Sequence, residues 1–311
     1  MNDYAPLAIF TYNRPEHLSS LLDSLSLNPE AKFSTAFFFA DGLKRDADKK
    51  KCDEVLKIIN STSIFKDKFI VNRERNLGLK ENILSGVSDV LKKYEKIIVL
   101  EDDLICESNC LNFLNKSLAF YSEEKDVWQI NAHSVTGNLL LSNKSRLIDD
   151  VNSWAWATWS DRWEPFIKSE IFLKQKSYFN QQDLENLDRY YHYSADLEGN
   201  LNGSTRTWAV FWKIFVLMQE GLSVFPSKSY VFNIGFDGTG ENSGDGDPFR
   251  TKLNKKKTEK FQKKIVKNRL YVFIVYCFWR VYYIKRYIKF HSKKVESKNA
   301  FKEYLSRKFK S

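Results

Sequence analysis

The spacing of apolar residues changes repeatedly over the first 135 residues, and the change predicts strands that alternate with helices. Apolar residues three and four apart predict helices that begin at Pro15 and near Ala47, Leu79 and Asn109. Short, mainly apolar runs predict buried strands at Leu7–Tyr12, Phe33–Ala40, Phe69–Asn72, Ile97–Leu100 and Val127–Ala132. This order is typical of an α/β fold with a mostly parallel central sheet flanked by helices.

Polar residues follow three of these strands at the point where each strand ends. They are Asn13 and Arg14 after the first strand, Asp41 after the second, and Glu101-Asp102-Asp103 after Ile97–Leu100. Ligands of such sheets bind beyond the carboxyl ends of the strands. We therefore expect the three groups to line one cleft.

The acidic triplet is the strongest chemical signal in the chain. Three adjacent carboxylates repel one another unless a cation offsets their charge. A divalent cation bound through Asp oxygens, diphosphate and water would do so, and it would also stabilise a departing nucleoside diphosphate. A solvated acidic turn is the alternative interpretation.

The other strand-end residues have two interpretations each. Arg14 could contact a diphosphate or uracil at the start of a helix, or belong to an ordinary helix start capped by Asn13. Asp41 could accept a hydrogen bond from a nucleotide, or serve as the turn residue before Gly42. The segment from Arg75 to Lys80, which includes Asn76, is a candidate second wall of the nucleotide pocket.

Several chemistries are disfavoured. The chain has neither a GxxxxGK[ST] loop nor a GxGxxG segment after its first strand, which disfavours kinases and dinucleotide oxidoreductases. Its four histidines are scattered, and its four cysteines have the spacing of neither a zinc site nor a disulfide framework. We expect reduced cysteines. The N-terminus lacks a basic-then-apolar leader, so a cytoplasmic location is the default expectation.

The order of four motifs resembles a known family. TYNRP, FFFADG, RNLGL and VLEDDL resemble the inverting glycosyltransferases of the GT-A fold, in particular bacterial family 2-like enzymes similar to the N-acetylglucosaminyltransferase I group. SWAWATWSDRWEPF and FPSKSYVFNIGFDGTG resemble segments of bacterial polysaccharide glycosyltransferases. The resemblance covers about residues 5–245. It implies a GT-A-like domain over 1–250, with a nucleotide-binding half (1–133) and an acceptor half (134–250).

The resemblance also implies roles for individual residues. Asp103 matches the direct ligand of Mn2+ (or Mg2+), and Glu101 and Asp102 match residues near the ribose and the donor sugar. The glycine-rich segment from Gly235 matches a loop that closes over the donor. The other positions expected to bind the nucleotide are Thr11, Arg14, Asp41, Asn76 and Lys80.

The catalytic base is where the sequence departs from this pattern. In the related group an Asp follows a Trp and acts as base, but Ala209 follows the matching Trp208. An inverting transfer still needs a carboxylate that accepts the proton of the acceptor hydroxyl. The acids of the second half are Asp161, Glu164, Asp237 and Glu241. We favour Asp161 because it lies among aromatic residues that could stack on a sugar, although such tryptophans are more often part of a core.

The last sixty residues differ from the rest in charge. Residues 251–311 contain 20 Lys or Arg against 3 Asp or Glu, within a chain of net charge +10. The apolar run Leu270–Trp279 is too short to span a membrane, and basic residues flank it. We expect a basic amphipathic tail that contacts an anionic membrane surface rather than nucleic acid. A helix packed on the body with a solvated basic face is the alternative.

Together these features predict an inverting, metal-dependent glycosyltransferase that uses a nucleotide-sugar donor, UDP-sugar favoured. Its expected acceptor is a lipid-linked oligosaccharide of bacterial O-antigen or capsule synthesis, and its expected location is the inner face of the cell membrane. The rivals are a sugar-phosphate nucleotidyltransferase and a catalytically inactive sugar- or membrane-binding module.

Overall fold

The computed structural model describes residues 4–134, 144–173, 185, 188, 193–204, 207–238, 251, 253–254, 260–281 and 284. The strands of the main sheet are β1 (Leu7–Thr11), β2 (Thr35–Ala40), β3 (Asp67–Asn72), β4 (Lys96–Glu101), β6 (Val127–Asn131), β7 (Arg146–Ile148), β8 (Trp156–Trp159) and β9 (Leu222–Phe225). A small sheet pairs β5 (Leu104–Cys106) with β10 (Val231–Asn233). The α-helices are α1 (Pro15–Ser26), α2 (Lys49–Ser61), α3 (Gly78–Leu91), α4 (Cys110–Phe120), α5 (Ser160–Leu173), α7 (Tyr193–Leu201) and α8 (Ala209–Met218), and 3-10 turns lie at Ala31–Phe33 and Asp46–Asp48.

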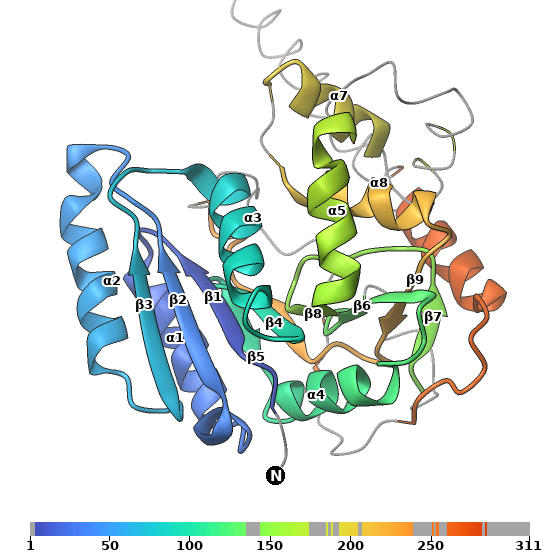
Figure 1. Cartoon of the computed structure of the whole chain (residues 1–311), viewed down its shortest axis with the longest axis horizontal. Coiled ribbons are helices and arrows are strands. Elements are labelled where there is room, and N and C mark those ends of the chain that lie inside the picture. The colour runs from blue at the N-terminus through green and yellow to red at the C-terminus, as the bar shows by residue number, and fades with distance from the viewer. Residues whose placement is uncertain are drawn as a thin grey trace, which may run out of the picture.

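The main sheet has the order β3-β2-β1-β4-β8-β6-β9-β7 (Figure 1). The first four strands are mutually parallel, β8 is antiparallel to both β4 and β6, and β7 is antiparallel to β9. The structure thus confirms the predicted α/β fold with a large, mostly parallel sheet flanked by helices. The strands and helices predicted over the first 135 residues are all present, with ends that differ by a few residues.

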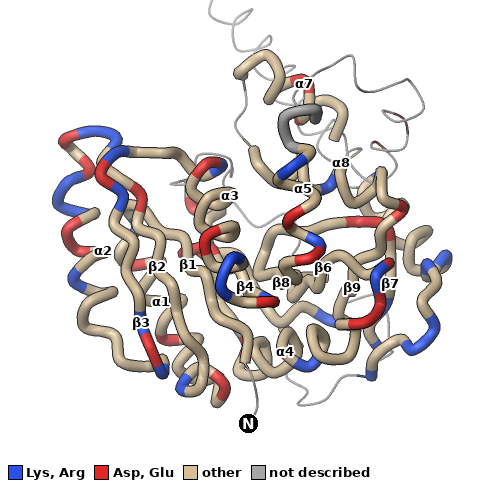
Figure 2. Tube along the Cα trace, viewed as in Figure 1, with Lys and Arg blue, Asp and Glu red and all other residues tan. Residues whose placement is uncertain are grey.

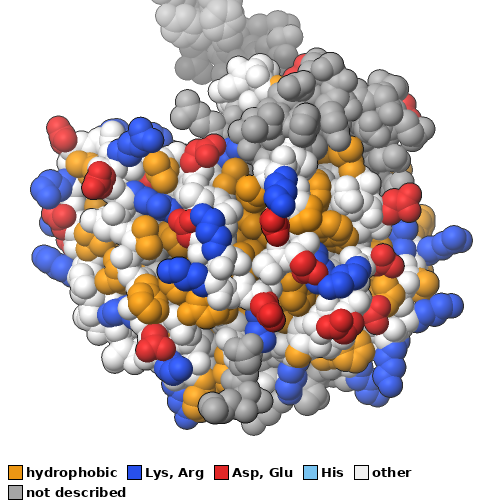
Figure 3. All heavy atoms as spheres, in the orientation of Figure 1, with side chains coloured by type: hydrophobic (Ala, Val, Ile, Leu, Met, Phe, Trp, Pro, Cys, Tyr) orange, Lys and Arg blue, Asp and Glu red, His pale blue; other side chains and the backbone are white. Residues whose placement is uncertain are grey.

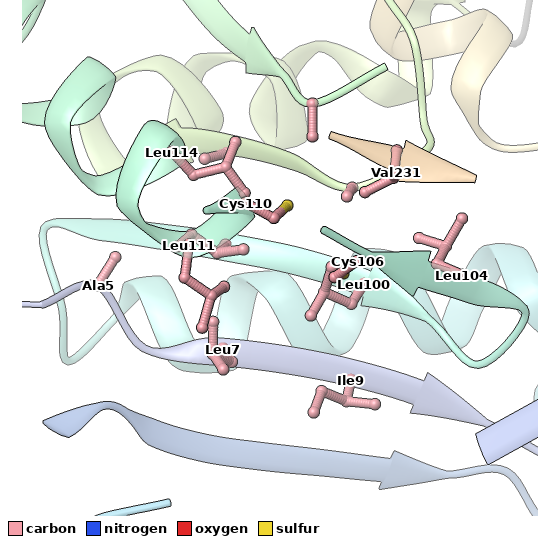
Figure 4. Packing of buried hydrophobic residues seen from close by; sticks show 14 of the residues in the cluster. Ala5, Leu7, Ile9, Leu100, Leu104, Cys106, Cys110, Leu111, Leu114 and Val231 are labelled. Atoms are coloured by element: carbon pink, nitrogen blue, oxygen red, sulfur yellow. The ribbon is translucent and has the colours of Figure 1, made fainter. Parts of the chain in front are cut away.

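Two apolar layers cover the two faces of the sheet. Alternate residues of β1 point to opposite sides, so Leu7 and Ile9 join the layer under α1, α2 and α4, while Ala8 and Phe10 join the layer under α3, α5 and α8. Figure 4 shows the side chain of Leu7 pointing toward that of Leu111 on α4. Burial on both faces explains why β1 and β4 are almost wholly apolar in sequence.

The second half of the chain packs around aromatic rings. Trp156, Trp163, Trp208 and Trp212 are buried together, with ring centroids 5.2 Å apart for Trp156 and Trp208 and 5.3 Å apart for Trp163 and Trp212. These rings join β8, α5 and α8 into one layer. They are therefore core residues and cannot serve as a sugar platform.

The described part of the basic tail packs on the body. The helix over residues 269–281 places Tyr271, Val275 and Trp279 against Ile148 of β7 and Phe225 of β9. Asn268 N donates to Leu147 O (2.8 Å). The predicted division at residue 250 remains a prediction, but residues 260–281 are not a detached extension.

The opposite side of the same helix is apolar and exposed, at Leu270, Phe273 and Val281. Lys263, Lys264, Lys267, Arg269 and Arg280 are exposed around it. Figure 2 shows Lys and Arg along the segment that leads into this helix, and Figure 3 shows such side chains projecting from that edge of the molecule. Within the described residues, no helix is long and apolar enough to cross a membrane.

Candidate active site

The predicted strand-end groups do meet at one edge of the sheet. Asp41 N donates to Thr11 O (3.0 Å), and Asp102 N donates to Phe10 O (3.1 Å), so the residues after β2 and β4 flank the end of β1. The parallel register of β1 with both neighbours produces this meeting. It places the acidic triplet beside the loop that carries Arg14.

Arg14 pairs with the last two acids of the triplet. Its guanidinium donates to Asp102 Oδ1 through Nη2 and to Asp103 Oδ2 through Nη1, the latter at 3.2 Å. Burial works against the charged form, but Asp102, Asp103 and Glu101 more than offset it, so the pKa of Arg14 is raised. The cation that the triplet requires is thus supplied in part by this arginine.

One guanidinium does not balance three carboxylates. Burial and the neighbouring Asp103 raise the pKa of Glu101 to about 8, although Arg14 opposes the shift. Burial also raises the pKa of Asp102, against the effect of Arg14. The Thr11 side chain and Tyr12 N, which is 3.4 Å from Asp102 Oδ2, favour the ionised form of Asp102. Protonation thus relieves part of the charge of the cluster, and a divalent cation bound in place of those protons would let Glu101 and Asp102 ionise.

Asp103 is oriented by a segment from the second half of the chain, residues 233–235. Asn233 Nδ2 lies 3.3 Å from Asp103 Oδ1, and Ile234 N donates to Asp103 O (2.8 Å). A Cβ on Gly235 would lie 2.4 Å from Asp103 Oδ2, so only glycine leaves room for this carboxylate. Asn233 has no local pattern in the sequence that marks it as a site residue. The only signal was the resemblance of the segment that contains it.

Asp41 holds a loop of its own chain. Its carboxylate accepts from Gly42 N (2.8 Å), Leu77 N (2.8 Å), Gly78 N (2.9 Å) and Asn76 Nδ2 (3.1 Å). The structure thus supports the structural interpretation of Asp41 and shows what it shapes, the loop before α3. Direct contacts of Asp41 and Asn76 with a nucleotide stay predictions.

Asp48 fixes the loop that carries Arg14. Its carboxylate accepts from Tyr12 Oη (3.0 Å), Asn13 Nδ2 (3.0 Å) and Arg45 Nε (3.0 Å). Asn13 is therefore not the helix cap that the alternative interpretation of this segment assumed, because its side chain donates to Asp48 and α1 has no side-chain cap. Asp48 lies in a charged stretch of the sequence, where nothing distinguished it from a surface acid.

Lys80 lies on the first turns of α3. Its Nζ is 3.8 Å from the centre of the Phe211 ring on α8, a cation–π contact between the two halves of the chain. This contact explains its position, and its role toward a nucleotide stays a prediction.

The structure does not bring Asp161 to this site. Trp159 pairs with Lys96 at the first residue of β4, and Ser160 N donates to Glu95 O (2.8 Å). Asp161 follows directly, whereas Glu101 is five residues along β4, about 16 Å away. The prediction that Asp161 is the base is therefore wrong, because β8 runs antiparallel to β4 and carries Asp161 to the far edge.

Asp161 is also engaged elsewhere. It accepts from Lys125 Nζ (2.8 Å) and Arg162 Nη1 (2.6 Å). Burial would raise its pKa, but these two cations more than offset the effect and lower it. A carboxylate with a lowered pKa is a weaker base.

A second side of the site comes from the segment after β10. Asp237 Oδ2 lies 3.2 Å from His17 Nε2 on α1. Phe236 packs edge-to-face on Trp154 (5.6 Å between centroids), which in turn contacts the His133 ring (4.4 Å). Burial lowers the pKa of His133 to about 3, so this ring is neutral. The rest of the predicted glycine-rich loop, 239–247, lies outside the described residues.

The described residues contain no preformed metal cage. Within them, no group of three or more His, Cys, Asp or Glu side chains is arranged to hold an ion. The four cysteines are free, as expected.

No protein-family profile matches the chain, and no curated protein does. Among solved structures it is similar to an active-site mutant of LgtC at 7% identity and a TM-score of 0.37, over 68% of this chain and 70% of that one. It is similar to the mannosyltransferase PcManGT from Pyrobaculum calidifontis, in complex with GDP-Man and Mn2+, at 10% identity and a TM-score of 0.36, over 70% of each chain.

It is also similar to a fragment of S. aureus TarS at 17% identity and a TM-score of 0.35, over 54% of this chain and 49% of the fragment. The chain thus spans about half the length of that fragment. Likenesses with TM-scores below 0.5 are too distant to assign a family, so we infer the function from the side chains of the site.

Proposed function

We propose that the chain is an inverting glycosyltransferase with a GT-A-like domain. The observation that carries the proposal is the cluster of Glu101, Asp102 and Asp103 with Arg14 at the carboxyl edge of the sheet. A buried cluster of three carboxylates with one guanidinium, placed where such sheets bind ligands, suits a cation and the diphosphate of a nucleotide-sugar.

The donor set fits a cation that takes most of its ligands from the substrate. Asp103 would hold Mn2+ or Mg2+, with donor phosphates and water as the other ligands, since one or two carboxylates suffice for such sites. Bound there, the ion would supply charge stabilisation for the leaving diphosphate. Asn233 and Gly235 support this assignment because they fix the Asp103 carboxylate in one orientation.

The nucleotide would lie along the loops after β1, β2 and β3. Asp48 fixes the loop from Thr11 to Arg14, and Asp41 fixes the loop from Asn76 to Gly78. Two loops held by buried carboxylates make a preorganised wall, which lowers the entropic cost of binding. UDP-sugars remain the favoured donors.

The acceptor is proposed to be a lipid-linked oligosaccharide of bacterial surface polysaccharide. Support comes from the helix over 269–281, which exposes Leu270 and Phe273, at 68% and 62%, among basic residues. Such a face binds anionic lipid surfaces. We accordingly propose a cytoplasmic protein peripheral to the inner face of the cell membrane, with contact through residues 251–311.

A catalytically inactive sugar- or membrane-binding module is the second candidate. Ala209 favours it, because the chain lacks an Asp after Trp208, and Trp208 itself is buried in the aromatic layer. Such a module would bind its ligand without turnover.

A donor panel tests the proposal. The full chain is incubated with Mn2+ and each common UDP-, GDP- and dTDP-sugar, and released nucleoside diphosphate is measured with and without EDTA. We expect slow, EDTA-sensitive hydrolysis of one donor. Asp103→Asn should lower the rate about 100- to 1,000-fold. Glu164→Gln, an exposed acid on α5, is the matched control and should leave the rate unchanged.

Two results would contradict the proposal. Absence of hydrolysis with every donor, combined with absence of a Mn2+-dependent thermal shift with any nucleotide, would exclude a transferase. Retention of sugar or vesicle binding in the same sample would then favour the binding module.

A further inference from the structure

A side chain of the protein occupies the place between two acids of the cluster. The guanidinium of Arg14 bridges two adjacent carboxylates, with Nη2 on Asp102 Oδ1 and Nη1 on Asp103 Oδ2, the latter at 3.2 Å. A cation that contacts two carboxylates at once lies where their attractions add. The bridge therefore marks the position at which this edge of the sheet binds positive charge most strongly.

Arg14 and a divalent ion would compete for Asp103. Asp103 Oδ1 accepts from Asn233 Nδ2 (3.3 Å), while Oδ2 accepts from Arg14 Nη1 and lies against Gly235. Of these neighbours, Arg14 is the one with a charge. Like charges repel strongly when they lie a few ångströms apart in a site with little water. An ion that binds the Asp103 carboxylate must therefore displace the guanidinium.

The guanidinium can leave while its backbone stays in place. Arg14 O accepts from Leu18 N (3.0 Å) on α1, and the side chain of the preceding Asn13 donates to Asp48. The Arg14 side chain is 20% exposed, against 3% for Asp102. Among the described residues, the two aspartates are the partners of its head group. Rotation of one long side chain is thus enough for the exchange, and the loop need not move.

The displaced guanidinium needs another acceptor. The planar fork of an arginine fits phosphate oxygens as well as carboxylates. A divalent ion by itself brings no acceptor that replaces the two carboxylates, whereas an ion that arrives with a diphosphate brings several phosphate oxygens. Exchange is therefore more favourable for the ion and the diphosphate together than for the ion alone.

We propose that Arg14 is an exchangeable counter-ion, which a divalent cation displaces from Asp102 and Asp103 and which then donates to the diphosphate of the nucleotide. The inference rests on the proposed function and adds to it that metal and nucleotide bind cooperatively through one side chain. Arg14 opposes binding of the metal alone, and it favours the nucleotide once the metal is bound. By thermodynamic linkage, each ligand raises the affinity of the other by the same factor.

Two binding equilibria of the full chain test the proposal. The first is binding of Mn2+ alone, followed by the loss of the electron paramagnetic resonance signal of free Mn2+. The second is binding of UDP, GDP or dTDP at saturating Mn2+, followed by isothermal titration calorimetry. We expect Arg14→Met to bind Mn2+ alone about 10-fold more tightly, and to bind the preferred nucleoside diphosphate about 10-fold more weakly. The signs are opposite because the guanidinium competes with one ligand and contacts the other.

Lys49→Met is the matched control. It removes the same charge from the first half of the chain, at a side chain of α2 that is 69% exposed. Both affinities should stay within about twofold of the wild type, because solvent and salt screen an exposed charge. A long-range effect of net charge on Mn2+ would instead appear equally in Lys49→Met and Arg14→Met, and it would overturn the proposal.

Arg14→Lys keeps the charge but loses the planar fork that bridges the two aspartates. Its two affinities should change with the same signs as in Arg14→Met, by about threefold each. This variant replaces Arg14→Met if the latter does not fold. Inorganic pyrophosphate, measured by displacement of the nucleotide, should weaken by the same ratio as the nucleotide, because it has the diphosphate without base or ribose. An unchanged pyrophosphate affinity would overturn the contact with the diphosphate.

The outcomes distinguish this inference from the proposed function. If the wild type releases nucleoside diphosphate from a donor, but Arg14→Met binds Mn2+ no more tightly, the exchange is overturned and the transferase stands. Weaker binding of both ligands would show a purely structural role of Arg14 and would also overturn the exchange. A wild type that binds neither Mn2+ nor any of the nucleotides, and that releases none, would overturn both proposals.

Discussion

Two ion clusters in this protein both pair basic side chains with aspartates, but they differ in composition and in surroundings. In the first half of the chain, Arg14 pairs with Asp102 and Asp103 at the carboxyl edge of the sheet. In the second half, Lys213 of α8 pairs with Asp150, beside Asp149, which pairs with Lys267 (2.7 Å). Each cluster contains adjacent aspartates that follow a strand.

Access separates the two. Lys213 and Asp150 are 2% and 8% exposed, whereas Arg14 is 20% and Asp103 13% exposed near the end of β1. The second cluster has two lysines for its two aspartates, whereas the first has one guanidinium for the three carboxylates of Glu101, Asp102 and Asp103. A pair of acids after a strand therefore indicates a ligand site only where the fold leaves it accessible and short of positive charge.

The largest effect is expected at the enclosed cluster. Lys213→Met should lower the free energy of unfolding by about 3–5 kcal/mol, because it leaves Asp150 buried without its cation. Chemical denaturation measures the change. The double variant Lys213→Met/Asp150→Asn should recover at least half of it, and equal losses in the single and double variants would contradict the ion-pair explanation.

The same substitution at the open cluster should cost less. Arg14→Met is expected to lower the free energy of unfolding by about 2–3 kcal/mol, since Arg14 is partly exposed and solvent can screen the acids. The stabilisation by Mn2+ should increase, because the cation replaces the missing guanidinium. Thermal melts with and without Mn2+ test this, and an unchanged Mn2+ effect would show that the two cations do not share the acids.

Acid pH should lower the free energy of unfolding through His133, whose ring contacts Trp154. Its folded pKa, about 3, lies below the unfolded value of about 6.5. Between these two values His133 binds a proton in the unfolded state and not in the folded state. Stability present above pH 6.5 is therefore lost as the pH falls toward 3. Between pH 7.5 and 5 the wild type should lose about 2 kcal/mol more than His133→Gln. Parallel pH profiles of the two proteins would contradict this.

The smallest effect is expected at the far edge of the sheet. Asp161→Asn should leave turnover unchanged and lower the free energy of unfolding by less than about 1 kcal/mol, because Asp161 is 46% exposed and the buried Arg162 keeps the backbone acceptors Ser122 O and Glu124 O. A large loss of kcat would contradict this prediction, because it would show that Asp161 takes part in the reaction. Urea melts and the donor assay check both parts.

The sequence alone determined the first half of the fold and the position of the acidic triplet. Apolar runs covered on both faces, helices with one apolar side, and Pro15 at a helix start are local signals, because each depends on neighbours within a few residues. Alternation of strands with helices then requires that strand ends meet, and Thr11, Asp41 and Asp102 do meet.

Only the tertiary structure decided which side chains share the site. The antiparallel direction of β8 removed Asp161, and the pairing of β10 with β5 brought Asn233 and Gly235 to Asp103. Strand direction and pairing across 130 residues leave no periodic trace in sequence, because they are set by the packing of whole layers. The tail likewise showed its apolar run in sequence, but only packing on β7 and β9 decided which side is buried and which is exposed.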